Sequence, residues 1–318
     1  MEPLPEPPPA PHPVGRKSAL AFFGVLLALW LPGAVAQSTV LPLGLAWTEL
    51  FVFLLASLVA TAGSNLRARP YLRLGPARPA AVAAGALAGG AGYLFAGAIL
   101  SLTERWAPVR WVEAFDPVRL FAGPLHERLL LALVATVLAP ACEEIAFRGY
   151  VQTTLGLAHR PAASILGAAV LFALLHVNPV LFPALVVLGA LFGWLTWRAG
   201  SIWPAVAAHA VNNGITSGLV LSGAGPDPAR APPPVAAVAS AVAFGGGALL
   251  LAIAAYRAAT PEPPPPAAEA VVLRDPALPS IAFSPRRVPL ALLSAVLTGA
   301  ALLAALLAAR AMGLGRPP

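Results

Sequence analysis

The chain has 318 residues, of which 58% are hydrophobic and 10% are charged, and its mean hydropathy is +0.79. Soluble domains carry about 25% charged residues, so this composition excludes an ordinary soluble domain and indicates a chain whose solvent is lipid. The formal net charge of +7 would favour nucleic-acid binding in a soluble protein. Here the basic residues stand singly or in pairs between apolar runs, so we predict no nucleic-acid partner and interpret them as determinants of membrane topology.

The chain begins with a Pro-rich stretch, 1–17, which is typical of a disordered leader. An apolar run follows it and ends near Gln37. The sequence Ala34-Val35-Ala36 resembles the end of a signal peptide. The long polar leader and the many later apolar runs favour a first transmembrane helix instead.

A helix needs about 20 mostly apolar residues to cross a bilayer, and several runs of this kind follow one another. We predict an all-α, polytopic transmembrane bundle of about eight or nine spans, with candidates at 18–36, 46–64, 80–103, 128–156, 161–178, 180–198, 201–222, 234–256 and 288–311. The fourth candidate is the most polar. It contains Pro140, which predicts a kink or a re-entrant geometry.

The loop arginines predict the orientation of the bundle. If the spans alternate, the side with more basic residues holds Arg16, Lys17, Arg67, Arg69, Arg73, Arg78, Arg160, Arg198, Arg257, Arg274, Arg286 and Arg287. The other side holds Arg105, Arg110, Arg119, Arg230, Arg310 and Arg316. The positive-inside rule then places the N-terminus in the cytoplasm. The abundance of Ala, Pro and Arg beside a single Lys suggests a GC-rich coding sequence, and hence a bacterial cell membrane.

The predicted organisation has four parts. They are a cytoplasmic leader at 1–17, N-terminal helices with an interfacial segment at 18–125, a core with intramembrane polar residues at 126–222, and C-terminal helices at 223–318 with a Pro-rich linker near 260–270. The stretch 104–127 mixes Trp, Phe and charged residues, which is typical of an amphipathic segment in the membrane interface.

Ionisable side chains inside a membrane are costly, so they usually face a cavity or a partner. Among the acidic residues, only Glu49, Glu143 and Glu144 fall within the predicted helices. We expect Glu49 to reach the interface, because it lies near the end of its predicted span. The predicted intramembrane titratable set is therefore Glu143, Glu144, Arg148, His176 and His209. The one cysteine, Cys142, lies in an apolar run and is interpreted as a packing residue.

The first of these elements is Glu143-Glu144-Ile145-Ala146-Phe147-Arg148. Glu144 and Arg148 share a helix face at i,i+4, which predicts an ion pair. Glu143 points about 100° away and lacks such a local partner. A free carboxylate in an apolar site can act as a general base. The alternative is a purely structural salt-bridge network of all three residues, and this helix alone leaves both readings open.

The other two elements are Phe172-x-x-x-His176 and His209-x-x-x-Asn213. A lone His on an apolar helix is more often structural than catalytic. His209 and Asn213 share a helix face by their i,i+4 spacing. Asn in a membrane helix also commonly forms a hydrogen bond with a neighbouring helix. Taken singly, each element is a weak signal.

Together, the three motifs resemble the CPBP family of intramembrane proteases, which includes the type II CAAX prenyl endopeptidases and bacterial relatives linked to bacteriocin self-immunity. The resemblance covers about 140–215 and carries Glu-Glu-x-x-x-Arg, Phe-x-x-x-His and His-x-x-x-Asn on separate helices. It implies that Glu143 activates a water with help from His176, while His209 and Asn213 stabilise the oxyanion. It also implies a membrane-associated peptide or protein substrate, whether prenylated, otherwise lipid-anchored or neither.

Glu143, His176 and His209 would also suit zinc as a ligand set. The chain has no His-Glu-x-x-His motif, and the resemblance favours catalysis without a metal. We therefore expect no cofactor, with zinc as the alternative.

Two other classes of function remain open at this point. One is a non-catalytic scaffold or bacteriocin-immunity protein of the same fold. The other is a proton-coupled transporter, in which the buried Glu, Arg and His residues would form a relay. The sequence shows neither an inverted repeat nor a matched pair of broken helices, which does not favour a transporter.

Overall fold

The computed structural model describes residues 16–116, 120–224, 233–262 and 264–275. These residues form helices joined by loops, and the one β-type pairing among them is the isolated antiparallel bridge between Leu66 and Leu273. The all-α prediction is confirmed. Most of the predicted leader and the ninth predicted span, 288–311, lie outside the described residues.

Six helical segments of the described chain are long and apolar enough to cross a membrane. They are α1 (Arg16–Thr39); the continuous run of α2 (Leu41–Trp47), η1 (Thr48–Leu55) and α3 (Ala56–Gly63); α5 (Pro79–Trp106); a run that begins with α7 (Leu125–Leu133); α11 (Phe182–Ala199); and α13 (Val235–Ala259). The bundle is therefore polytopic. Two further helices match predicted spans in position: α10 (Pro161–Leu175), which is shorter, and α12 (Trp203–Leu221), which carries several polar residues.

The second span begins earlier than predicted, and this corrects the placement of Glu49. The helix starts at Leu41 with a proline in its first turn, a position where the missing N–H group of Pro42 costs nothing. Glu49 consequently lies two turns inside the helix and is only 1% exposed. The expectation that it reaches the interface is wrong.

The fourth span runs without interruption from Leu125 to Gly156, so the predicted re-entrant geometry is not observed. It consists of α7, η3 (Val134–Leu138), α8 (Ala139–Glu144), η4 (Ile145–Gln152) and α9 (Thr153–Gly156), where η3 and η4 are π-helical. Pro140 lacks an N–H group, and its ring crowds the preceding turn. The wider π-type turn accommodates it, as Ala139 N–H donates to the carbonyl of Val134.

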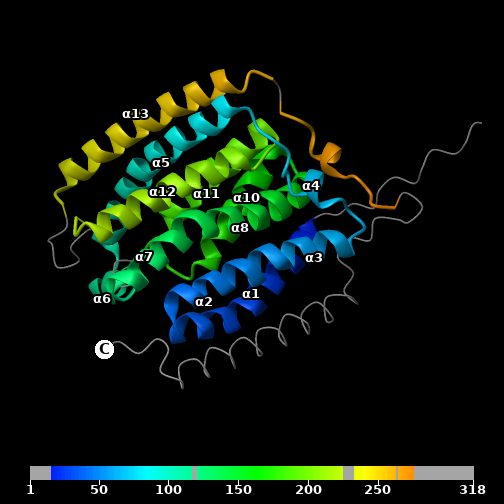
Figure 1. Ribbon diagram of the computed structural model, residues 1–318. Helices are drawn as coiled ribbons and strands as arrows, with labels where there is room; N and C mark the ends of the chain where they lie inside the picture. The colour runs from blue at the N-terminus through cyan, green and yellow to red at the C-terminus, as the bar shows by residue number, and fades with distance from the viewer. Residues whose placement is uncertain (1–15, 117–119, 225–232, 263, 276–318) are drawn as a thin grey trace, which may run out of the picture.

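The helices lie side by side in two apolar clusters (Figure 1). One cluster joins α1, η1, η4 and α10 and includes Phe22, Phe53, Phe147 and Phe172. The other joins α5, α11, α12 and α13 and includes Ala88, Phe192, Ala208 and Tyr256. Large apolar side chains such as Leu87, Phe244 and Leu251 are exposed on the outside. Lipid is the environment in which such a surface is stable.

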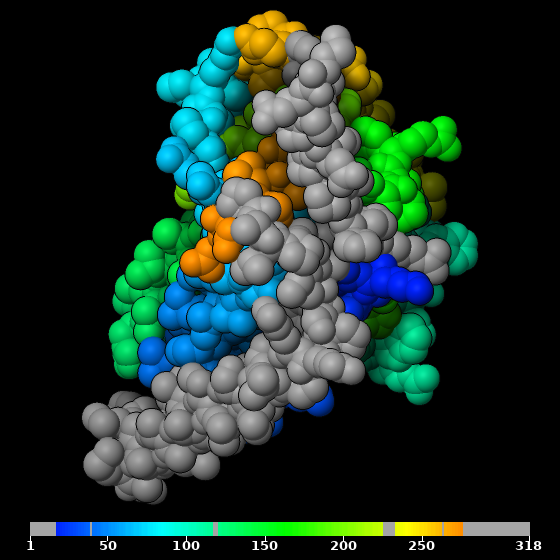
Figure 2. All heavy atoms as spheres, turned by 90° about the vertical axis from the view of Figure 1, so that its right-hand side faces the viewer, coloured from blue at the N-terminus to red at the C-terminus, as the bar shows by residue number. Residues whose placement is uncertain are grey.

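The arginine-bearing loops meet at one end of the bundle. The loop between α3 and α5 lies against the segment after α13: Arg67 N–H donates to Val272 O, and Arg78 pairs with Glu262. Ile202 N–H donates to Arg73 O, which brings the start of α12 to the same place. Figure 2 looks onto this end, where 264–275 (orange) lies beside the loop after α3. Its assignment to the cytoplasm stays a prediction.

Helices α5 and α12 approach so closely that glycine is required at their contact. A Cβ on Gly89 would overlap the carbonyl oxygen of Ala208, and one on Gly85 would crowd the carbonyl of Pro204. Small residues at helix contacts in membranes allow this approach. The contact fixes the position of α12, and therefore that of the polar residues that α12 carries.

We expect Gly89→Ala to destabilise the protein by about 1–3 kcal/mol, because the added methyl group meets rigid backbone and forces the helices apart. The matched control is Gly97→Ala on the same helix, where a Cβ meets nothing within 4 Å. That variant should be neutral or up to about 1 kcal/mol more stable, because alanine favours helix. Unfolding of both variants in detergent tests this; equal stabilities would contradict it.

Candidate functional site

The polar residues singled out in the sequence lie where the two apolar clusters meet. Glu143 and Glu144 end α8, Arg148 lies on η4, and His209 and Asn213 lie on α12. His176 directly follows the last residue of α10. Three helical segments thus contribute to one region in the middle of the bundle.

Arg148 and Glu144 form an ion pair, with Nη1 2.8 Å from Oε1, and both side chains are fully buried. The second guanidinium nitrogen, Nη2, donates to the carbonyl of Gly189 on α11 at 3.0 Å. The guanidinium carbon lies 4.6 Å from the ring centroid of Phe172 and 5.4 Å from that of Phe192. Charge, hydrogen bonding and aromatic faces together compensate the loss of water around this cation.

His209 lies between the two carboxylates. Its Nδ1 is 2.9 Å from Glu144 Oε1, and its Nε2 is 3.7 Å from Glu143 Oε2. The imidazole ring stacks on Phe192, with centroids 4.9 Å apart. Glu144 therefore orients the ring by one nitrogen and leaves the other nitrogen directed toward Glu143, as a supporting carboxylate does in many sites.

Glu143 is 9% exposed, and its Oε2 is buried without a hydrogen-bond partner among the described residues. Buried polar atoms without partners are uncommon in native proteins. A hydrogen bond from a water or from a substrate group would satisfy this oxygen.

His176 does not contact Glu143 directly. Its Nδ1 is 3.0 Å from the carbonyl oxygen of Phe172, in the turn before it, and the described residues show no hydrogen bond between Glu143 and His176. The Phe172 ring touches both histidines, with centroids 4.7 Å from His176 and 5.9 Å from His209. A bridging water or substrate is needed for His176 to act together with Glu143.

Asn213 uses part of its hydrogen-bonding capacity for structure. Its Nδ2 donates to the carbonyl of Ala135 on η3 at 2.9 Å, and its Oδ1 accepts from Asn212 Nδ2 at 3.1 Å. An amide nitrogen has two N–H groups. One N–H of Asn213 thus remains for a ligand, in a side chain whose orientation is fixed.

Glu49 is a residue of this region that the sequence interpretation missed. It lies close enough to Glu143 for the two carboxyl groups to interact electrostatically, and its Oε2 has no hydrogen-bond partner in the described part of the chain. The signal was present, because Glu49 is an ionisable residue in an apolar run. The predicted start at 46 put it at a helix end and concealed its depth.

The alternative zinc ligands are not brought together. Within the described ranges, no three His, Cys, Asp or Glu side chains are arranged so that they could hold a metal ion. His176 is separated from the Glu143–His209 pair by the Phe172 ring. The residues therefore do not fit zinc in this arrangement.

A family model described as type II CAAX prenyl endopeptidase, Rce1-like, matches residues 125–215. Residues 125–215 belong to this family. The matched segment of this CAAX-protease family contains all the motif residues, from Glu143 to Asn213. It gives this part of the chain the fold of an intramembrane CAAX-type protease. No curated protein matches the chain, and no solved structure does.

We expect Arg148→Met to destabilise the protein by about 3–5 kcal/mol, because it leaves the Glu144 carboxylate buried without a cation. The double variant Glu144→Gln/Arg148→Met should recover part of this loss, since the uncompensated charge is then gone. Unfolding in detergent provides the measurement.

The control for this prediction is Arg78→Met, which breaks the exposed pair with Glu262. It should cost no more than about 1 kcal/mol, because exposed ion pairs contribute little. If Arg148→Met costs no more than Arg78→Met, the assigned role of the buried pair is wrong.

Proposed function

We propose that the protein is an intramembrane endopeptidase in which Glu143 activates a water that hydrolyses a peptide bond of a membrane-associated protein. The observation that carries this proposal is the buried Oε2 of Glu143, which has no hydrogen-bond partner in the described ranges and lies beside Nε2 of His209. Its position inside the segment that matches the CAAX-protease family supports the proposal. The protein is integral to a membrane. We further propose a bacterial cell membrane with the N-terminus in the cytoplasm.

In the proposed reaction, Glu143 takes a proton from a water whose oxygen attacks the carbonyl carbon of the scissile bond. The carbonyl oxygen becomes an oxyanion, which the remaining N–H of Asn213 stabilises as a donor. Because Nδ1 of His209 donates to Glu144, His209 donates to the oxyanion from Nε2 only as an imidazolium that carries both ring protons. His176 helps to orient the water. When the tetrahedral intermediate collapses, the C–N bond breaks, and the proton on Glu143 passes to the leaving amine.

The ion pair has a positioning role in this scheme. Glu144 accepts from Nδ1 of His209, and Arg148 holds Glu144. This arrangement keeps Nε2 of His209 toward the reacting atoms. Fixed donors of this kind need no reorganisation at the moment of reaction.

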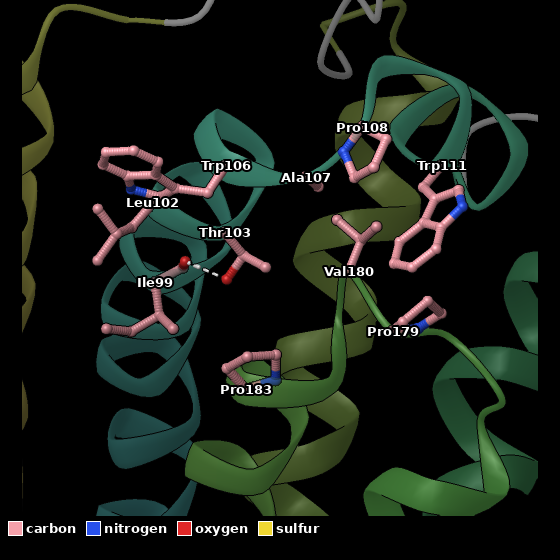
Figure 3. A pocket seen from close by; sticks show the side chains of 10 residues that line it. All are labelled: Ile99, Leu102, Thr103, Trp106, Ala107, Pro108, Trp111, Pro179, Val180 and Pro183. Carbon is pink, nitrogen blue, oxygen red and sulfur yellow. Dashed lines mark hydrogen bonds between the residues drawn. The ribbon is translucent and has the colours of Figure 1, made fainter.

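A pocket next to the loop after His176 suits an apolar part of the substrate. Its volume is about 540 Å³, and its walls come from the end of α5, from α6 (Val109–Ala114) and from the loop before α11 (Figure 3). Trp106, Trp111 and Val180 are among the side chains that line it. Asn178 ties the loop to α6 through a hydrogen bond to Phe115 O at 3.1 Å. We propose that this pocket binds the apolar group next to the cleaved bond.

The first test is peptide cleavage by the purified protein, using quenched fluorescent peptides with and without a prenyl group. Glu143→Gln should lower kcat by about 10²–10⁴-fold, the usual contribution of a general base. The matched control, Glu113→Gln, changes an exposed glutamate on α6 and should cleave like wild type. Before cleavage is compared, both variants should be shown to have the same thermal unfolding temperature as wild type.

A chelator distinguishes water activation by Glu143 without a metal from hydrolysis that depends on zinc. Cleavage that survives the chelator and is lost in Glu143→Gln supports water activation by the glutamate alone. Cleavage that the chelator removes, and that zinc restores, contradicts catalysis without a metal. Wild type that cleaves no peptide, but takes up protons in proteoliposomes, contradicts the protease proposal as a whole.

The pocket generates a separate prediction. Ala107→Trp should fill it and raise KM by roughly 10- to 100-fold, since burying one apolar group is worth about 1.5–3 kcal/mol. The value of kcat should stay within a few fold, because the reacting groups are untouched. Ala80→Trp, at the exposed other end of α5, is the control. An unchanged KM in Ala107→Trp would remove the pocket from the substrate path.

A further inference from the structure

Arg73 is a buried cation that forms no ion pair with any residue that the structure describes. Its side chain is 7% exposed, and its Nε donates to Thr153 Oγ1 at 3.0 Å. Among the described residues, no carboxylate forms an ion pair with it, in contrast to Arg148. Burial lowers the pKa of the Arg73 guanidinium, and no neighbouring carboxylate opposes this shift. A charge buried in this way usually indicates a missing partner.

Arg73 lines a pocket of about 420 Å³ at the arginine-bearing end of the bundle. Arg69 lines the same pocket and is exposed, so the cavity is lined by one buried and one exposed arginine. Pro265, Pro266 and Glu269, in the segment after α13, also line it. The pocket lies outside the membrane-spanning helices and far along the chain from Glu143.

The backbone holds both arginines in place. Arg73 has φ of 53°, a left-handed conformation that is unfavourable for residues other than glycine. Two hydrogen bonds maintain it: Leu74 N–H donates to Arg69 O at 2.9 Å, and Ile202 N–H donates to Arg73 O at 3.1 Å. Conformations of this kind persist where the surroundings impose them, and they concentrate at ligand-binding positions.

We propose that this pocket binds a phosphate group, either that of an anionic phospholipid headgroup or a free phosphate. The planar guanidinium fork matches phosphate oxygens in pairs. Basic pockets at the membrane boundary commonly bind anionic headgroups. A phosphate bound there would supply a negative charge beside Arg73, between the loop that joins α3 to α5 and the segment after α13.

Glu269 lines the same pocket and works against anion binding. Its carboxylate forms no ion pair with either pocket arginine in the described structure. Removing its charge should therefore strengthen phosphate binding, whereas removing a pocket arginine should weaken it. These opposite signs distinguish a built site from general attraction by a basic surface.

The experiment is thermal unfolding of the full-length protein in detergent, with phosphatidylglycerol, phosphatidylcholine or inorganic phosphate added at constant ionic strength. Wild type should show a saturable rise in Tm with phosphatidylglycerol, with phosphate, or with both, since a ligand of the folded state stabilises it. A rise with phosphatidylglycerol only assigns the site to lipid. A rise with phosphate alone at the same concentration assigns it to the free anion.

Four variants complete the test. Arg73→Gln and Arg69→Gln should abolish or reduce the rise, and Arg69→Gln keeps the bond between Arg73 and Thr153 if Arg73→Gln fails to fold. Glu269→Gln should move the midpoint to lower ligand concentration. Arg67→Gln, an exposed arginine of the same loop that does not line the pocket, should behave like wild type. No rise in wild type, or an equal rise in Arg69→Gln and Arg67→Gln, overturns the proposal.

Discussion

The structure depends on the need to neutralise Arg148 inside a bundle of apolar helices. A guanidinium among apolar helices needs a counter-ion for its charge and hydrogen-bond acceptors for its N–H groups. Glu144 meets the charge, Gly189 accepts a hydrogen bond, and two phenylalanine rings cover the faces. These partners come from α8, α10 and α11, and Glu144 in turn bonds His209 on α12. One cation therefore connects the two apolar clusters and sets the register of the helices at their junction.

The same network explains why Glu143 differs from its neighbour. Adjacent residues on a helix point about 100° apart, so Arg148 can neutralise only one of the two glutamates directly. Glu143 is left without a guanidinium partner among the described residues, and Nε2 of His209 lies 3.7 Å from its Oε2. Glu143 is thus available as the proposed general base because Arg148 pairs with Glu144 instead. A site built in this way is rigid, because movement of Glu143 or His209 would also disturb the ion pair.

Local spacing was enough to predict the all-α bundle and the shared face of Glu144 and Arg148, since both follow from helix periodicity and hydropathy. Contacts between helices were not accessible in this way. The resemblance pairs Glu143 with His176, whereas the structure brings His209 nearest to it and turns His176 toward Phe172 O. The depth of Glu49 was missed because Pro42 begins the helix earlier than the apolar run suggests. The continuous path through Pro140 depends on a π-helical turn, which periodicity at 3.6 residues does not reveal.

Buried charges in this protein fall into two kinds, and the difference indicates where ligands act. The charges of the Arg148–Glu144 pair match each other within the chain and support structure, although Glu144 Oε2 and Arg148 Nε have no hydrogen-bond partner among the described residues. In the part of the chain that the structure describes, Glu143 Oε2 has no hydrogen-bond donor, and the Arg73 guanidinium forms no ion pair. Because an uncompensated group costs free energy in the empty protein, a ligand that completes it recovers that cost on binding. The missing partners differ in chemistry, a proton donor for Glu143 and an anion for Arg73, so one ligand cannot serve both positions. The proposed catalytic centre and the proposed phosphate pocket are therefore independent sites, joined through the fourth span that carries both Glu143 and Thr153.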